Sequence, residues 1–411
     1  MLYLNVLNAL QNCQRVLANT KQYFKVQTEK IIMTGRERII KLLNGESPDR
    51  IIYSPNIWQW FYHHKNHNTL PEQLKHCTDL LEAHLALGED CFSRNLASDQ
   101  REQWYGGFTD FKYDPTINLT LERNGPYKKM LYNTPAGTLE EEFLYEQKSS
   151  TLIQTKYILD GDLKNQLISF KHLISSTHFE FDAKRWNLYE ARLGDAGMNI
   201  CGCWCNPLKL FHFAANPANT TFILHDYPSV AQEIMEIHTD RCIESIKQAI
   251  AGGVKCIMTM DNLDSNFFPP PYFEKYCAPF FKKISQLCHQ YNVKVFSHAC
   301  GQIKELLPYC MKSGLDGLEG VTPPPLGDIE LYDALSSTEY KFICIGGISA
   351  HVQQQVKSKQ ECFEFTRNLF SELISKKAFV LGMSCNTTID TSFDVIRWFG
   401  EATKEYSGLI S

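Results

Sequence analysis

Residues 255–301 read KCIMTMDNLDSNFFPPPYFEKYCAPFFKKISQLCHQYNVKVFSHACG. Two short apolar runs, residues 255–260 and 293–297, flank a longer segment, residues 270–291, in which apolar side chains recur at helical spacing. A buried strand, an amphipathic helix and a second buried strand together form the repeating unit of a parallel sheet. This stretch therefore predicts a βαβ unit.

The same alternation of short apolar runs and amphipathic segments continues along most of the chain after Pro48. We expect strands at seven places: residues 51–53, 198–204, 255–260, 293–297, 317–321, 342–346 and 379–382. Their spacing favours an α/β fold built as a single (β/α)8 barrel of the TIM type. We assign residues 33–411 to this one domain, because no internal repeat and no low-complexity linker interrupts them.

Two segments depart from the pattern. Residues 1–32 precede what looks like the start of a domain, where Thr34 can cap a first helix, so we expect a separate N-terminal helical extension there. Residues 134–154 alternate polar and apolar side chains around Pro135 and Gly137. That alternation predicts a β-hairpin inserted above the barrel, where it would cover one side of the mouth.

The overall composition argues against several classes of partner. A net charge of -5, from Lys+Arg 41 and Asp+Glu 46, provides no broad positive field for nucleic acid. No apolar run approaches the roughly 20 residues that span a bilayer, and the N-terminal residues lack the pattern of a signal peptide. Fifteen cysteines are odd in number and dilute in a chain of 411 residues. They favour a reduced, cytoplasmic setting over a disulfide framework.

The side chains that point to chemistry stand at the expected strand ends. His298 and Cys300 close one strand and share one side of an extended chain, Glu319 interrupts the next apolar strand, and Cys385 follows the last. Functional groups of a parallel barrel gather at the carboxyl ends of its strands. One imidazole, two thiolates and one carboxylate suit four-coordinate zinc and not magnesium or calcium. Taken singly, each residue has an ordinary structural explanation, such as a buried cysteine; taken together, they predict a zinc site.

Other candidates carry weaker signals. Trp58 and Trp60 follow the first strand and could wall an apolar or aromatic substrate pocket, with core packing as the alternative. The alternating cysteines of residues 201–205 lack the two-residue gap of a thiolate knuckle, so we interpret them as structural. The histidines of residues 63–67 fall in a polar stretch that predicts a solvated loop.

Five stretches also resemble a known superfamily: TGRERIIKLLNGESPDRI, SFKHLISS, MTMDNLDSNFFPPPYFEKYCAPFFKKI, FSHACGQIKELLPYCMKSGLDGLEGVTPPPLGD and GMSCNTTIDTSFDVIRW. From residue 33 to about residue 407 the chain resembles the uroporphyrinogen decarboxylase-like superfamily, whose fold is a (β/α)8 barrel. Within it, His298, Cys300 and Cys385 look like the zinc site of methylcobamide:coenzyme M methyltransferases and related corrinoid-dependent methyltransferases, including O-demethylase components. Glu319 is similar in position to a further zinc ligand of those proteins, one that we expect substrate to displace.

The resemblance also bears on two other positions. Asp261 matches an aspartate that recurs at a strand end in the superfamily, which implies a catalytic role in binding substrate or orienting a ligand. Asn262 shares that position in the substrate pocket, and for both residues a helix cap or turn is the alternative. Decarboxylases of the superfamily carry an Arg-Gln-Ala-Gly run. Here residues 53–64 read YSPNIWQWFYHH, without an arginine to clamp the acetate and propionate groups of a porphyrinogen.

The resemblance therefore implies a zinc-dependent methyltransferase. It would move a methyl group between a corrinoid (methylcobalamin), carried by a separate corrinoid protein, and a small-molecule methyl donor or acceptor, either a thiol or a methoxylated compound. Zinc suits this chemistry because it keeps a bound thiol ionised at neutral pH. The alternatives are a metal-free lyase acting on a carboxylated substrate and a non-catalytic, corrinoid-binding accessory barrel. A homodimer is also possible, through the TPPPLGD loop or the N-terminal extension.

Overall fold

The computed structural model describes residues 33–98, 107–202, 204–339, 341–373 and 378–407. The chain divides into two units, Met1–Thr34 and Gly35–Ser411. The helical extension predicted for residues 1–32 lies outside the described residues. All the elements named below belong to the second unit.

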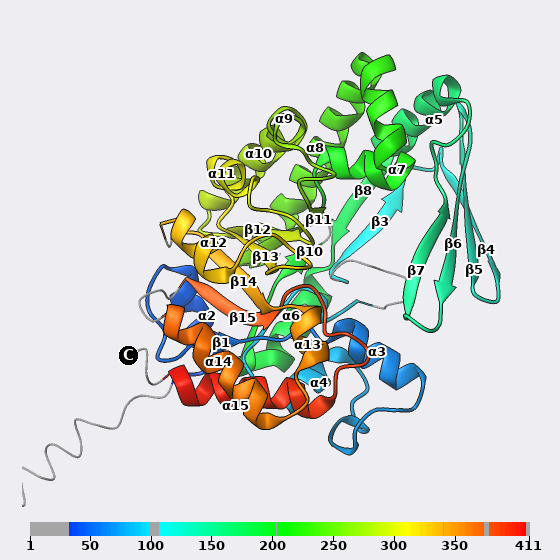
Figure 1. The fold of residues 1–411 in the computed structure, drawn as a ribbon. Helices are drawn as coiled ribbons and strands as arrows, with labels where there is room; N and C mark the ends of the chain where they lie inside the picture. The colour runs from blue at the N-terminus through cyan, green and yellow to red at the C-terminus, as the bar shows by residue number, and fades with distance from the viewer. Residues whose placement is uncertain (1–32, 99–106, 203, 340, 374–377, 408–411) are drawn as a thin grey trace, which may run out of the picture. The chain divides into compact units, whose positions relative to one another are not determined.

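A seven-stranded, entirely parallel sheet forms the centre of this unit (Figure 1). Its strands, in order across the sheet, are β1 (Ile52–Tyr53), β15 (Phe379–Met383), β14 (Ile343–Ile348), β13 (Gly317–Val321), β12 (Lys294–Ala299), β11 (Cys256–Leu263) and β10 (Cys201–Gly202). Strand β2 (Cys91–Ser93) pairs in parallel with β9 (Gly197–Asn199), which leads through Ile200 into β10. From β10 to β15 neighbours in the sheet are successive strands of the chain, as in a curled sheet of βα units.

The predicted strands agree with these elements to within three residues at each end, and residues 317–321 coincide with β13. The strand predicted at residues 198–204 is present as two short pieces, β9 and β10. Strand β2 is absent from the prediction, because Cys-Phe-Ser is too short to display a period of two.

Helices follow the strands and cover the sheet (Figure 1). They are α2 (Gly35–Leu43), α3 (Trp58–Asn66), α4 (Leu80–Leu87), α5 (Leu163–Ser175), α6 (Ala183–Leu193), α7 (Pro207–Asp226), α8 (Pro228–Ala251), α9 (Pro270–Tyr272), α10 (Ala278–His289), α11 (Leu307–Lys312), α12 (Leu331–Ser337), α13 (Ala350–Gln355), α14 (Lys359–Leu373) and α15 (Phe393–Ser407). Short 3-10 turns lie at Glu72–Leu74 and Gly194–Ala196, and a π-helical turn at Phe273–Cys277 joins α9 to α10. None of the described helices is long and apolar enough to cross a bilayer.

The solvated loop predicted around residues 63–67 is wrong. His63 and His64 belong to α3, and His67 caps its carboxyl end. The helix forms because Trp60 and Phe61 bury one face against the core, and the half-buried His63 and His64 are hydrogen-bonded to Ser150 and to the carbonyl oxygen of Ile389. Polarity alone did not reveal that these histidines have partners elsewhere in the fold.

Between β2 and β9 the chain leaves the parallel sheet. Strand β3 (Thr109–Tyr113) pairs antiparallel with β8 (Thr177–Phe181). A separate antiparallel sheet consists, in order, of β4 (Asn118–Asn124), β5 (Tyr127–Thr134), β6 (Gly137–Glu146) and β7 (Thr151–Lys156) (Figure 1). Residues 134–154, for which the sequence predicts a hairpin, are thus part of a larger four-stranded sheet.

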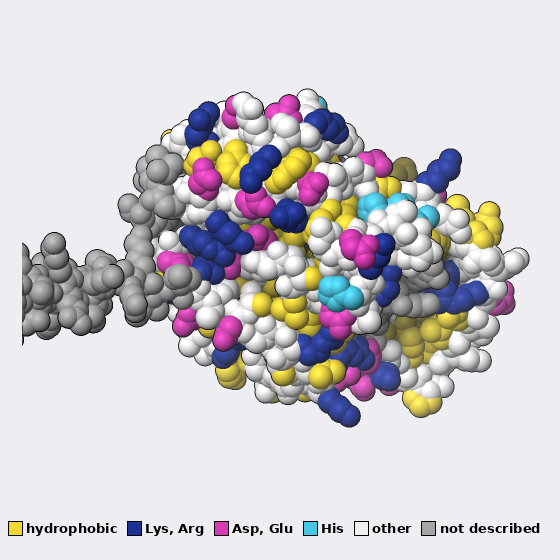
Figure 2. Space-filling model, turned by 90° about the horizontal axis from the view of Figure 1, so that it is seen from below, with side chains coloured by type: hydrophobic (Ala, Val, Ile, Leu, Met, Phe, Trp, Pro, Cys, Tyr) yellow, Lys and Arg dark blue, Asp and Glu magenta, His cyan; other side chains and the backbone are white. Residues whose placement is uncertain are grey.

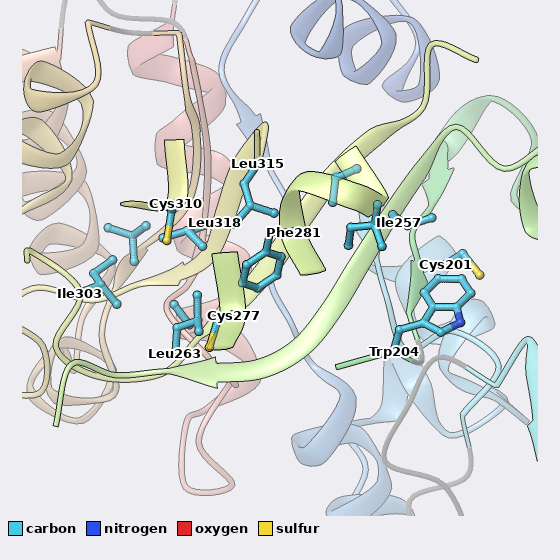
Figure 3. Close-up of a cluster of buried hydrophobic side chains, with 14 of the residues drawn as sticks. Cys201, Trp204, Ile257, Leu263, Cys277, Phe281, Ile303, Cys310, Leu315 and Leu318 are labelled. Atoms are coloured by element: carbon cyan, nitrogen blue, oxygen red, sulfur yellow. The ribbon is translucent and has the colours of Figure 1, made fainter. Parts of the chain in front are cut away.

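The strands face two cores. Met258, Phe296 and Val380 pack with Ile39 and Leu42 of α2 in one cluster. Because the first residues of β1, β11 and β14 belong to the same cluster, α2 lies at the amino ends of the strands. Alternate side chains such as Ile257 and Leu318 enter a larger cluster between the sheet and its helices (Figure 3). The carboxyl ends of the strands are therefore left for the loops and their functional groups.

Charged side chains of both signs are interspersed on the face of the molecule seen in Figure 2. This surface fits the small net charge of the chain. A single-sign field of the kind that attracts nucleic acid does not stand out on this face.

Candidate metal centre

Three of the predicted ligands come together at the carboxyl ends of two strands. His298 lies at the end of β12, Cys300 follows that strand, and Cys385 follows β15. One ligand atom from each residue lies within 4.8 Å of the others. Cys300 Sγ is 3.5 Å from Cys385 Sγ, which in turn is 3.7 Å from His298 Nε2.

These distances fit zinc. With Zn–S bonds of about 2.3 Å and Zn–N bonds of about 2.0–2.1 Å, tetrahedral geometry puts two sulfur ligands about 3.8 Å apart and a sulfur and a nitrogen about 3.6 Å apart. The observed separations of 3.5 and 3.7 Å are close to both values. A Cys2His set also leaves the fourth position open, which is the arrangement of catalytic zinc sites.

Glu319 lies beside this group and not within it. Strand register sets Glu319 directly opposite His298. Its Oε2 is hydrogen-bonded to Nδ1 of His298 and accepts a hydrogen bond from Nε of Arg94 at 3.2 Å. Two nitrogen donors, His298 Nδ1 and Arg94 Nε, thus hold the carboxylate beside the imidazole, and direct metal ligation by Glu319 stays a prediction. A carboxylate in that place orients a metal-binding histidine.

Neighbouring charges shift the pKa values of the residues in the site. Burial raises the pKa of the Glu319 carboxyl, but Arg94 and His298 outweigh burial and bring that pKa down to about 2. Burial opposes protonation of His298, yet the charge of Glu319 raises the pKa of the imidazole. Hydrogen bonds from Cys385 and His298 lower the pKa of the Cys300 thiol to about 4, whereas the contact with Cys300 raises the pKa of Cys385. The two sulfurs thus share a hydrogen bond, and His298 beside them favours an ionised thiol.

The loop that bears Cys385 is anchored by the ends of three other strands. Asn56 Nδ2, after β1, donates to the carbonyl oxygen of Cys385 at 2.7 Å. Thr322 Oγ1, after β13, donates to the carbonyl oxygen of Ser384 at 3.2 Å. The backbone N–H of Gly347, in β14, donates to Ser384 Oγ at 3.1 Å. The sulfur is thus held by several strands at once, as a preformed site requires.

Two glycines allow the strand ends to approach. Gly320 has a φ of +99, and a Cβ there would lie 1.9 Å from the carbonyl oxygen of Ala299. Gly301 has a φ of +155, and its Cβ would lie 1.9 Å from Oδ2 of Asp264. At Gly320 a larger residue would push apart the backbones of two strand ends, whereas at Gly301 it would displace the Asp264 side chain.

A cavity of about 220 Å³ opens beside Cys300. Its lining consists of Lys209, His212, Pro217, Asn262, Asp264, Phe267, Phe268 and Cys300. The predicted pocket residue Asn262 lies in this lining, and it adopts a positive φ of 50. A substrate with one atom bound at the metal centre, next to Cys300, would have the remainder of the molecule in this cavity.

Lys209 and His212 are cavity residues that the sequence reasoning missed. Both lie in the first turns of α7, which follows β10. The clue in the sequence that could have identified them is their nearness to the end of a strand. Burial lowers the pKa of Lys209, and burial together with Lys209 lowers that of His212 to about 3, so the imidazole is neutral. Lys209 Nζ lies 4.4 Å from the ring centre of Phe213, and the charge of the buried Asp261 partly opposes the effect of burial on the pKa of Lys209.

Asp261 is fully buried next to the cavity, and its carboxylate has several partners. Its Oδ1 accepts hydrogen bonds from the backbone and side chain of Asn206, at 2.6 and 2.8 Å, and its Oδ2 accepts one from Ser297 at 2.8 Å. Asn206 is the N-cap of α7, where its side chain accepts the N–H of Lys209. Asp261 thus fixes the start of the helix that carries Lys209.

The two predicted pocket tryptophans do not line the cavity. Trp60 is buried, donates from Nε1 to the carbonyl oxygen of Thr391 at 2.8 Å and stacks on Phe393. Trp58 is half-buried at the start of α3. Core packing, the alternative to a substrate wall, accounts for Trp60. The buried Cys201 and Cys205 agree with a structural role, and Cys203 lies outside the described residues.

Comparison with known proteins places the fold. No curated protein matches the chain. Among solved structures it is similar to a methyltransferase from Methanosarcina mazei, with a TM-score of 0.58 and 12% identity over 91% of this chain and 99% of that one. A B12-independent methionine synthase from a Shewanella species has a TM-score of 0.40 and 10% identity over 57% of this chain and 71% of that one. At 12% identity the likeness to the Methanosarcina mazei protein concerns the fold alone. The family model of uroporphyrinogen decarboxylase (URO-D) matches residues 180–406, more than half of the chain, which therefore belongs to the URO-D family.

Proposed function

We propose that this protein is a zinc-dependent methyltransferase that uses a corrinoid as its methyl donor or acceptor. The observation that carries the proposal is the Cys2His group of His298, Cys300 and Cys385, whose donor atoms lie within 4.8 Å of one another at the mouth of a URO-D-family fold. The Methanosarcina mazei protein of the same fold is a methyltransferase by name. That likeness is compatible with the proposal but assigns no role to any residue.

The ligands would act through a substrate atom bound at the open fourth position. Zinc, when bound, would keep a substrate thiol ionised at neutral pH or polarise the oxygen of a methoxy group. His298 would bind through Nε2, because its Nδ1 is engaged by Glu319. The burial of His298 and Glu319 would keep water away from this side of the site.

Methyl transfer in either direction accounts for every bond formed and broken. Toward a thiol, the sulfur attacks the methyl carbon, an S–CH3 bond forms, the CH3–Co bond of methylcobalamin breaks, and cob(I)alamin leaves with the electron pair. From a methoxylated substrate, cob(I)alamin attacks the methyl carbon, the C–O bond breaks, and the released oxygen takes up a proton. We propose that the corrinoid arrives on a separate protein that docks over the strand ends.

The cavity beside Cys300 favours a small substrate with an acidic group. Lys209 offers a positive charge in a partly apolar space of about 220 Å³, together with Phe267 and Phe268. Burial of an ammonium group is costly even with the charge of Asp261 nearby, and an anionic ligand would offset part of that cost. Asp264, which lines the same cavity, opposes an anion, so the acidic group would have to lie on the Lys209 side. Lys209 also supports the second candidate, a metal-free lyase that acts on a carboxylated substrate.

Metal analysis separates the two candidates. We expect about one zinc per chain in wild type, its loss in Cys300→Ala and Cys385→Ala, and its retention in Cys362→Ala, which removes a buried thiol from α14. Zinc-loaded wild type should then demethylate methylcobalamin in the presence of a thiol, or methylate cob(I)alamin from a methoxylated compound. Wild-type protein that stays metal-free under reducing conditions with added zinc would exclude the methyltransferase and favour the lyase.

A further inference from the structure

We propose that the substrate is an α-amino acid whose side chain carries the sulfur or oxygen atom that exchanges the methyl group. Lys209 and His212 hold its carboxylate, and Asp264 holds its ammonium group. The inference rests on the proposed function, because it takes the cavity beside Cys300 as the substrate site. It adds the chemical class of the substrate, which the metal centre alone does not define.

The described lining of the cavity contains one positively and one negatively charged side chain, on two different elements. Lys209 belongs to α7, and Asp264 directly follows β11. Burial lowers the pKa of Lys209, and the acidic groups that oppose this effect are Cys205, Asp261 and Cys300; Asp264 is not one of them. No ion pair between Lys209 and Asp264 is present in the described part of the chain. The two charges therefore face one space without neutralising each other.

One oxygen of Asp264 is available to a ligand. Its Oδ1 accepts hydrogen bonds from the backbone and the side chain of Asn266, both at 2.9 Å. No donor among the described residues is bonded to Oδ2, which faces Gly301, where a Cβ would lie 1.9 Å from it. The other buried carboxylate of this region, Asp261, is fully enclosed and uses both oxygens in hydrogen bonds. A cationic group in the cavity thus has Asp264 as its partner.

His212 is an independent sign that the cavity binds a polar ligand. Its side chain is 7% exposed, and no residue in the described part of the chain is hydrogen-bonded to its ring. The ring nitrogens are not sealed off, unlike Nε2 of the buried His84, so they open onto the cavity that His212 lines. Burial and the charge of Lys209 lower the pKa of the imidazole to about 3, so the ring is neutral and has one N–H donor. Buried polar groups normally have a partner, which a bound carboxylate supplies here.

Lys209 and His212 are placed to share one carboxylate. They are three residues apart on α7, and side chains at that spacing lie on one helix face with their Cβ atoms about 5–6 Å apart. Lys209 supplies the charge and His212 a neutral donor. Each charge of the cavity opposes one simple ligand, because Asp264 repels an acid and Lys209 repels an amine. An α-amino acid carries both charges on one carbon atom and satisfies both sides.

The rest of the lining suits the side chain of such a ligand. Pro217, Phe267 and Phe268 are apolar, and the ring of Phe268 lies 4.9 Å from that of His212. Cys300 is the lining residue that also belongs to the ligand group of the metal centre. A short aliphatic chain between the charged end and Cys300 therefore brings its last atom to the metal centre.

The test uses three sulfur-free ligands of similar size and ligand-observed NMR titrations of the full-length protein. L-2-aminobutyrate is butyrate with an added ammonium group, and it is also propylamine with an added carboxylate. Asp264→Asn keeps an oxygen for Asn266 and removes the charge, whereas Lys209→Met and His212→Phe each remove one partner of the carboxylate. Asp394→Asn, which removes an exposed charge from α15, is the control.

We expect wild type to bind L-2-aminobutyrate at least about 10-fold more tightly than butyrate or propylamine. Lys209→Met should weaken binding of L-2-aminobutyrate and butyrate by about 10- to 150-fold, the range of hydrogen bonds to charged groups, and His212→Phe should weaken the same two by about 3- to 10-fold. Asp264→Asn should weaken L-2-aminobutyrate and propylamine by about 3- to 10-fold, because Asp264 is partly exposed, and should strengthen binding of butyrate.

Equal binding of the three ligands by wild type, or no binding of any, would overturn the proposal, and this ranking decides the matter even where a variant does not fold. An equal effect of Asp264→Asn on butyrate and on L-2-aminobutyrate would also overturn it. None of the ligands needs zinc, so the titrations run on metal-free and zinc-loaded protein alike. Wild type that takes up no zinc defeats the proposed function, whereas zinc-loaded wild type without a preference for L-2-aminobutyrate defeats only the amino-acid substrate.

Discussion

We predict that Lys209 makes the cavity prefer an acidic substrate. Its ammonium group lines the cavity of about 220 Å³ beside Cys300. A carboxylate 4 Å away gains about 4 kcal/mol at an effective dielectric constant of about 20. Desolvation offsets part of that energy and leaves about 1.5–3 kcal/mol, as for other hydrogen bonds to charged groups. Lys209→Met should therefore weaken binding of an acidic substrate by about 10- to 150-fold.

Titration calorimetry with three thiols of similar size tests this value on the zinc-loaded protein. We expect Lys209→Met to weaken binding of 3-mercaptopropionate but not of neutral 2-mercaptoethanol, and Lys209→Glu to favour cationic cysteamine instead. Lys312→Met, which removes an exposed lysine on α11, is the control. Equal weakening of all three thiols by Lys209→Met would refute the charge argument and indicate that Lys209 supports the fold of the cavity.

Four further outcomes can be checked. Asp261→Ala should lower the free energy of unfolding, measured by urea denaturation, by about 1–3 kcal/mol for each hydrogen-bond donor left unpaired. Asp261→Asn should nearly preserve that free energy. Loss of activity in a stable Asp261→Asn protein would instead indicate that Asp261 contacts the substrate. Gly320→Ala should cost at least about 2 kcal/mol and release zinc, because its Cβ would lie 1.9 Å from the carbonyl oxygen of Ala299; an unchanged melting temperature contradicts this. Burial lowers the pKa of His84 from 6.5 to about 4. Between these pH values only the unfolded chain binds a proton at this residue, so the free energy of unfolding falls as the pH falls, by up to about 1.4 kcal/mol per pH unit. His84→Leu should flatten this part of the profile of melting temperature against pH, and equal slopes in the variant and wild type would show that other groups dominate. Chelation of zinc should lower the melting temperature, and added zinc should restore it. A melting temperature that changes with neither chelator nor added zinc would argue against a bound metal.

Much of the fold could be predicted from local patterns. The apolar runs that became β11 to β15 are buried on both faces, so their composition alone separates them from the amphipathic helices between them. The same reasoning failed where an element is very short, as in β2, or where polar side chains of a helix have half-buried partners, as in α3. Those elements exist because of their neighbours, and a local pattern does not contain that information.

The sequence by itself determined which groups stand at the strand ends. His298, Cys300 and Cys385 could be chosen because parallel strands bring their carboxyl ends to one edge, whatever the details of packing. Tertiary structure decided how these groups divide their roles. It placed Glu319 on the outer nitrogen of His298, brought Arg94 to it from a strand that the sequence did not reveal, and turned Lys209 toward the space beside Cys300. Hydrogen bonds and charge pairs act over a few ångströms, so they depend on the separation of side chains in space and not on their separation along the chain.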